Sequence, residues 1–106
     1  MAIDSTSKLG DPYNKTANFA RALSHPARVK IVEMLSKEGD MTCGMITDQI
    51  PLSQATVSQH LKLLKSTNVI NMKRDGLKSI YTLNSEIVAE AHSFIYALLN
   101  QMINPL

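Results

Sequence analysis

Residues 52–65 have the sequence LSQATVSQHLKLLK, and this stretch decides the fold. When it is wound at about 100° per residue, Val57, Leu61 and Leu64 form one apolar stripe, whereas amides, hydroxyls and an ammonium group face the other way. Such polar groups can bond base edges and phosphates in the major groove of DNA. The stretch is therefore expected to be a helix that packs through its back and reads DNA with its front. An ordinary amphipathic surface helix would show the same pattern.

The residues just before this helix indicate a helix-turn-helix. Residues 43–50 are expected to form a short helix, which Pro51 prevents from continuing. The connection to Ser53, a suitable N-cap for the next helix, is very short. The two helices must therefore cross at a steep angle.

Two further helices are expected upstream. Residues 1–14 show no hydrophobic periodicity and are expected to form a mobile tail. A first helix follows and ends before Pro26, because the residue before a proline avoids the helical region. A second helix starts at Pro26, capped by Ser24 or His25, and ends at Gly39.

Downstream of residue 68 the hydrophobic period changes from about 3.6 to about 2 residues, which predicts a β-hairpin. A type I′ turn centred on Asp75 and Gly76 would place Lys73 directly opposite Lys78. Two opposed lysines repel each other, so this pair indicates a place where a phosphate would bind. The alternative is that both side chains extend into water.

Residues 85–103 carry the longest apolar stripe of the chain. On a helical wheel the stripe spans about 140°, and it comprises Ile87, Val88, Ala91, Phe94, Ile95, Leu98, Leu99 and Met102. Three short helices and a hairpin do not need so long a stripe, so we expect this helix to pack against a second copy of the chain. The alternative is burial wholly within its own chain.

Composition and charge indicate one domain with a basic face. The chain has 106 residues with 44% hydrophobic and 5% aromatic residues, which describes a soluble, aliphatic, helix-leaning protein, and no apolar run approaches the ~18 residues of a membrane span. There is no export signal and only one cysteine, so we expect a cytoplasmic location. The net charge is only +2, but residues 53–83 contain one acidic residue, Asp75, against Lys62, Lys65, Lys73, Arg74 and Lys78. This concentration is typical of a surface that binds a polyanion.

The order of these elements, together with three motifs, resembles the ArsR family of bacterial and archaeal winged helix-turn-helix transcriptional regulators. Residues 22–31 (ALSHPARVKI) are similar to the family's Leu-x-x-Pro-x-Arg-x-x-Ile motif. Residues 53–61 (SQATVSQHL) are similar to its recognition helix, and residues 74–83 (RDGLKSIYTL) to its wing. The resemblance covers about residues 15–103.

This resemblance implies a mainly α fold with a small two-stranded β-hairpin as the wing. Residues 15–106 would form a single winged-helix DNA-binding domain that ends in a dimerisation helix over residues 85–103. The first helix, through Phe19, would join the last helix in the dimer interface.

The resemblance further implies a DNA-binding transcriptional regulator, a repressor, that binds a near-palindromic operator in double-stranded DNA as a homodimer. It places eight residues at the DNA: Gln54, Thr56, Ser58, Gln59, His60, Lys62, Arg74 and Lys78. The N-cap Ser53 and Lys73 of the lysine pair are expected to face DNA as well. His60 lies at the flank of the apolar stripe. A hydrogen-bonded, half-buried position is therefore the alternative to a DNA contact for this residue.

Many members of the family release DNA when they bind a metal ion, but the expected ligands are missing here. Thr42 and Gly44 stand where the arsenic-sensing branch has a Cys-x-Cys pair. On the last helix, Glu90 and His92 point about 160° apart, so a metal site would need ligands that converge across subunits. No metal or other cofactor is expected, and the effector stays unknown. Cys43 is expected to be a small packed residue, with a redox role as the alternative.

The sequence contains no catalytic constellation. The three histidines fall on different elements without a nucleophile and carboxylate around them, and no glycine-rich phosphate loop occurs. We therefore do not expect an enzyme. A winged-helix module that docks a protein without specific DNA binding is the alternative function, since a fold does not fix a function.

Overall fold

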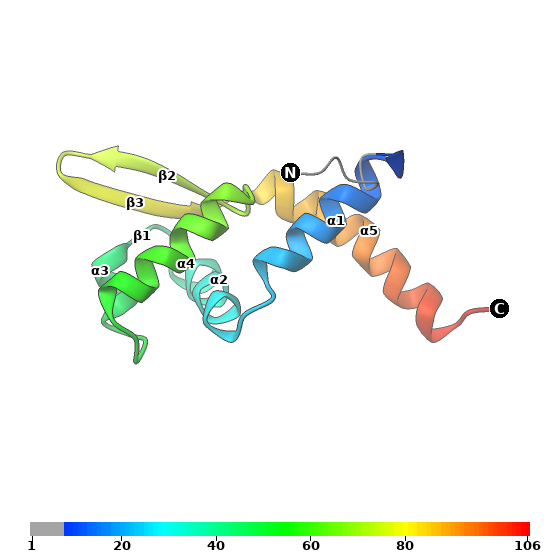
Figure 1. Ribbon diagram of the computed structural model, residues 1–106, viewed down its shortest axis with the longest axis horizontal. Helices are drawn as coiled ribbons and strands as arrows, with labels where there is room; N and C mark the ends of the chain where they lie inside the picture. The colour runs from blue at the N-terminus through cyan, green and yellow to red at the C-terminus, as the bar shows by residue number, and fades with distance from the viewer. Residues whose placement is uncertain (1–7) are drawn as a thin grey trace.

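The computed structural model describes residues 8–106. The elements in chain order are α1 (Asp11–Ala22), α2 (Pro26–Glu38), β1 (Met41–Thr42), α3 (Cys43–Thr47), α4 (Gln54–Ser66), β2 (Ile70–Asp75), β3 (Lys78–Leu83) and α5 (Ser85–Ile103). The hairpin of β2 and β3 projects from one end of the molecule, whereas α1 and α5 lie together at the other end (Figure 1). The expected mainly α fold with a small β wing is confirmed.

Helix α1 begins earlier than the sequence pattern predicts. Its first residue is Asp11, Gly10 precedes it with a φ of 103°, and Pro12 occupies the first turn. A proline in the first turn loses no intrahelical hydrogen bond, and an acidic residue there interacts favourably with the positive end of the helix dipole. The prediction that residues 11–14 belong to a mobile tail is therefore wrong, and residues 1–7 of that tail lie outside the described residues.

Helix α2 begins and ends where its capping residues predict. The side chain of His25 is the N-cap and accepts a hydrogen bond from the backbone N–H of Ala27, and Pro26 follows in the first turn. Gly39 ends the helix with a φ of 80°, a conformation that favours glycine.

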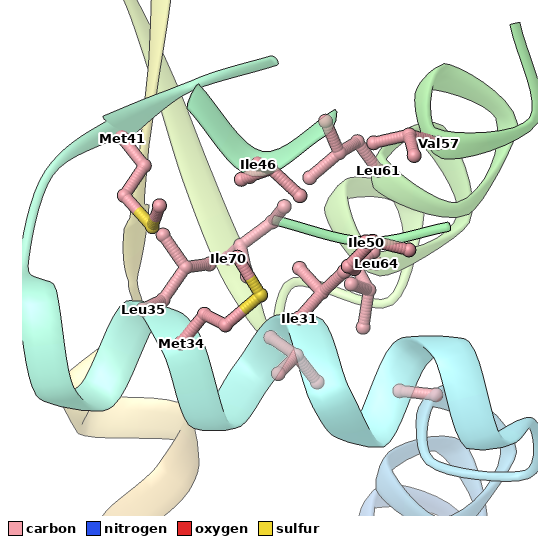
Figure 2. Packing of buried hydrophobic residues seen from close by; sticks show 12 residues of the cluster. Ile31, Met34, Leu35, Met41, Ile46, Ile50, Val57, Leu61, Leu64 and Ile70 are labelled. Atoms are coloured by element: carbon pink, nitrogen blue, oxygen red, sulfur yellow. The ribbon is translucent and has the colours of Figure 1, made fainter. Parts of the chain in front are cut away.

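The hydrophobic core lies between α2, α3, α4 and the start of β2. In Figure 2, side chains from α2 and α4 point toward one another across Ile46 of α3 and Ile70 of β2. Burial of a side chain of this size contributes about 1.5–3 kcal/mol. The apolar face of α4, formed by Val57, Leu61 and Leu64, is therefore anchored in the core.

Helices α3 and α4 form the expected helix-turn-helix. Helix α3 ends at Thr47 and not at Ile50, because residues 48–50 form turns ahead of Pro51. Ser53 is the N-cap of α4, and its hydroxyl accepts a hydrogen bond from the backbone N–H of Thr56 at 3.2 Å. The predicted cap is confirmed.

The sheet has three strands in the order β1-β3-β2, all antiparallel, so the two-stranded prediction was incomplete. Strand β1 is only two residues long, and Met41 pairs with Tyr81. A segment of two residues has no periodicity that a sequence pattern could reveal.

The register of the hairpin differs from the prediction. Asp75 pairs with Lys78 and Lys73 with Ile80, so the prediction that Lys73 lies opposite Lys78 is wrong. The turn therefore places an acidic residue and a basic residue opposite each other, which is the favourable arrangement.

The physical reason for this register is the position of Gly76. The two-residue loop is Gly76-Leu77, in which Gly76 has a φ of 65° and Leu77 has a negative φ. That is the pattern of a type II′ turn, which needs glycine only at its first central position. A type I′ turn would instead have required Asp75 to adopt a positive φ.

No helix among residues 8–106 combines the length and the apolar character that crossing a membrane would require.

Candidate nucleic-acid interface

Helix α4 presents a polar face on a rigid support. Val57, Leu61 and Leu64 are completely buried, with 0% of their surface exposed. On the other face the side chains of Gln54, Ser58, Gln59 and Lys62 are exposed to solvent, and Thr56 is half-buried. These side chains can make hydrogen bonds to base edges and phosphates without any rearrangement of the core.

The N-terminus of α4 is stabilised by Ser53 and Thr56 together. Besides accepting from the backbone of Thr56, the Ser53 hydroxyl donates to the Thr56 hydroxyl oxygen at 3.0 Å. No acidic residue lies in the first turn of this helix. Its positive end is therefore available to an anion such as a DNA phosphate.

The wing adds three exposed basic side chains, those of Lys73, Arg74 and Lys78. Arg74 Nη1 donates a hydrogen bond to Ser79 Oγ at 3.3 Å, across the two strands. At the tip, Leu77 is 95% exposed. The sequence reasoning missed Leu77 as a surface residue because its assumed register placed it within a strand.

An open hollow of about 390 Å³ lies between α4 and the wing. Gln54 and Ser58 line it from α4 and Lys78 and Ser79 from the wing, and Thr42 lines it beside α3. The structure therefore brings the recognition helix and the wing to one surface. Thr42 and Ser79 belong to this surface, and neither was among the residues expected to face DNA.

The basic side chains of this surface take no part in the ion pairs found among residues 8–106. Those ion pairs join Lys15 to Glu90 and Glu33 to both Lys30 and Lys37. The lysines of α4 and the wing are exposed, and none of them forms an ion pair in the described part of the chain. Their charge is therefore available to a polyanion.

His60 has the half-buried, hydrogen-bonded position that was one of the two alternatives for this residue. Its ring is half-buried and packs against the ring of His25, with 4.5 Å between the ring centroids. Its Nδ1 atom lies 3.2 Å from Nη1 of Arg28 on α2. Burial, reinforced by the nearby His25 and Arg28, lowers the pKa of His60 from its ordinary value of 6.5.

The apolar stripe of α5 is only partly covered by its own chain. Ala91 is 5% exposed and Ile87 packs against the core, so these two predicted interface residues are largely covered by their own chain. Phe94 packs edge-on against Tyr13 of α1, with ring centroids 5.5 Å apart. This part of the stripe is used to attach α5 to α1.

The remainder of the stripe is open to solvent. An apolar hollow of about 300 Å³ is lined by Phe19, Val88, His92, Ile95, Tyr96 and Leu99. Leu99 is 49% and Met102 65% exposed, and Leu98 is exposed as well. Side chains of this size on one helix face are unusual for a surface that meets only water.

Cys43 is half-buried and packs against the core, and its Sγ lies 3.9 Å from Oγ1 of Thr47. Burial, reinforced by Cys43, raises the pKa of Tyr81. Within residues 8–106, no group of three His, Cys, Asp or Glu side chains is placed to hold a metal ion.

The comparisons with known proteins agree with this architecture. The family model for the arsR family of bacterial regulatory proteins matches residues 25–71, from the cap of α2 into β2. The chain is 35% identical over 89 residues to the transcriptional repressor SdpR of Bacillus subtilis, covering 84% of this chain and 98% of SdpR. The protein belongs to the ArsR family. It is a DNA-binding transcriptional regulator.

Two solved structures share this fold. Rv0081 of M. tuberculosis superposes with a TM-score of 0.61 at 29% identity, over 89% of this chain and 99% of that chain. The homodimeric winged helix-turn-helix DNA-binding domain Mb0332 of Mycobacterium bovis, a possible ArsR-family regulator, gives a TM-score of 0.69 at 21% identity, over 99% and 94% of the two chains.

Proposed function

We propose that this ArsR-family regulator is a homodimeric transcriptional repressor that reads a near-palindromic operator with α4 and the wing. The observation that carries the proposal is the exposed polar and basic surface of α4 and the wing, mounted on three completely buried side chains. A reading helix needs this combination, because base contacts are specific only when the helix backbone is held in place.

The roles on this surface follow from side-chain chemistry. Gln54, Ser58 and Gln59 are exposed on α4, and we assign them to base edges, where an amide can bond adenine bidentately. Ser53 and Thr56 stabilise the N-terminus of the helix, which we assign to a backbone phosphate.

Charge on the same surface supplies affinity. Lys62, Lys73, Arg74 and Lys78 bear exposed cationic groups, which we assign to backbone phosphates. These contacts attract any duplex, and the amide contacts then select among sequences.

The open apolar face of α1 and α5 supports the homodimer. Phe19, Val88, Ile95, Leu98, Leu99 and Met102 offer side chains that a symmetric partner would cover. Mb0332, which shares the fold, is described as homodimeric. Two recognition helices related by a twofold axis would address half-sites about one helical turn, or roughly 34 Å, apart.

The repressor role comes from the relatives. SdpR is named a transcriptional repressor, and a relative in Xylella fastidiosa, 31% identical over 85 residues, is named a biofilm growth-associated repressor. A repressor of this size needs no chemistry of its own, because it acts by occupying DNA. We accordingly propose no catalytic function, no metal and no other cofactor.

A mobility-shift titration with the DNA upstream of the protein's own gene tests this function. We expect one site to bind at least about 1,000-fold more tightly than random duplex at physiological salt. The affinity for both duplexes should fall as salt rises, since several phosphate contacts are made. Equal affinity for all duplexes would contradict a sequence-specific repressor.

A further inference from the structure

Arg28 connects three elements of the molecule. Its Nε donates to the carbonyl oxygen of Ala22 at 2.9 Å, and its Nη2 lies within 3.4 Å of the carbonyl oxygen of Arg21, both at the end of α1. The same Nη2 donates to Ser24 Oγ at 3.2 Å. Its Nη1 meets His60 Nδ1 in α4 at 3.2 Å. One side chain on α2 therefore bonds the end of α1 and the middle of the recognition helix.

The contact with His60 fixes the protonation of that ring. A guanidinium group only donates hydrogen bonds, so the contact with Arg28 requires a lone pair on Nδ1 of His60. The neutral ring then carries its proton on Nε2. No buried side-chain nitrogen or oxygen among residues 8–106 lacks a hydrogen-bond partner, so this second nitrogen reaches solvent.

The surroundings of His60 disfavour a charged ring. The ionisable groups that face it are His25 and Arg28, and both act in the same direction as burial. A protonated His60 would lose the lone pair that accepts from Arg28 and would place a second positive charge about 3 Å from it.

We propose that Arg28 is a positioning residue for DNA reading. Through the Nδ1 atom of His60, it fixes the position of α4 relative to the end of α1. The proposal rests on the proposed function, in which α4 reads DNA. It implies that His60 acts through Arg28 and makes no essential contact with DNA. The α1–α5 end and the reading surface are thereby joined through polar contacts, separately from the apolar core.

Two substitutions of His60 separate this role from a direct DNA contact. The amide oxygen of His60→Asn can occupy the place of Nδ1, whereas the longer side chain of His60→Gln carries its polar end near the place of Nε2. We expect His60→Asn to retain the ratio of operator to random-duplex affinity within about threefold, and His60→Gln to lower it about tenfold, which corresponds to about 1.4 kcal/mol. The opposite order would overturn the proposal, because it would identify Nε2 as a DNA contact.

Substitutions of Arg28 test the other partner. Arg28→Lys keeps the charge but cannot bond all four partners, and we expect it to lower the specificity ratio about tenfold. Arg21→Lys is the matched control, since the Arg21 side chain makes no hydrogen bond or ion pair within the described residues. An unchanged ratio in a folded Arg28→Lys variant would overturn the proposal.

Two further measurements distinguish the proposed role of Arg28 and His60 from a general loss of structure in the variants. The ¹⁵N shifts of the free protein above pH 7 should show His60 protonated at Nε2 alone, and Arg28→Lys should change them; a proton on Nδ1 would overturn the proposal. The specificity ratio of the wild type should also fall as the pH is lowered below 6.5, because protonation removes the acceptor, whereas that of His60→Asn should stay flat over the same range. A ratio that rises with acidity in the wild type would overturn it as well.

The wild-type titration separates this inference from the proposed function. If wild-type protein does not distinguish operator from random duplex, the reading function fails and the role of Arg28 in reading fails with it. If the wild type distinguishes them and the Arg28 and His60 variants behave like it, only the inference about Arg28 fails.

Discussion

The recognition helix α4 and the terminal helix α5 are built in opposite ways. Three apolar side chains of α4 are completely buried by its own chain, and apart from the small Ala55 its exposed side chains are polar. Helix α5 has 19 residues but only one buried residue, Ala91, and its open side chains include leucine, methionine and isoleucine. The difference indicates that α4 is complete in one chain and directed at a polar partner, whereas α5 requires a second apolar surface.

The largest expected effect concerns the support of α4. We expect Leu61→Ala to lower the free energy of unfolding by about 2–5 kcal/mol, because it removes a fully buried side chain and leaves a cavity. Urea denaturation followed by circular dichroism measures this change. Leu77→Ala is the matched control, since Leu77 is 95% exposed and its loss should cost under about 0.5 kcal/mol. Equal effects of the two substitutions would show that α4 is not anchored as described.

The next effect concerns α5. Leu99→Glu would place a charge in the apolar surface proposed to meet a second copy, and the twofold axis would introduce it twice. We expect the dimer to dissociate about 100-fold more readily, or about 2.7 kcal/mol, as measured by sedimentation at several protein concentrations. Gln101→Glu adds the same charge at an exposed position and should leave the dimer intact. An unchanged dimer in Leu99→Glu would exclude this face as the interface.

A smaller effect is expected for the amide of Gln59. Its removal in Gln59→Ala should reduce discrimination between operator and altered sites by about 1–3 kcal/mol, since a base contact is lost. Binding to random duplex should barely change. Competition titrations against single-base variants of the operator measure this. A uniform loss of affinity for every duplex would mean that Gln59 contacts the backbone instead.

The smallest expected effect is that of a single wing lysine. Lys78→Ala should weaken all duplexes similarly and lower the slope of log affinity against log salt by about 1. The comparison with Gln59→Ala therefore separates contacts with backbone phosphates from contacts with base edges. A loss confined to the operator would contradict the assignment of the wing to phosphates.

The local signals in the sequence predicted most of this fold. Ser53 is an N-cap as expected, and of the two candidates Ser24 and His25 it is His25 that caps α2. The stripe of α4 is buried as its spacing of three and four residues indicated. These features depend on residues close together in the chain, so the sequence carries them directly.

The remainder depends on contacts between distant residues. The predicted hairpin register was wrong by one residue, because the turn has Gly76 and Leu77 at its centre and not Asp75 and Gly76. Strand β1 exists only through its pairing with β3. The contact of Arg28 with His60 joins residues 32 positions apart, and no spacing rule indicates it.

Selection of bound sequences from a randomised duplex library tests the central claim most directly, since it examines the reading helix and the dimer together. We predict enrichment of two inverted half-sites whose centres lie about one helical turn, 10–10.5 base pairs, apart. A single enriched half-site would contradict the twofold arrangement through α1 and α5. No enrichment at all would contradict the assignment of α4 and the wing to sequence-specific DNA binding.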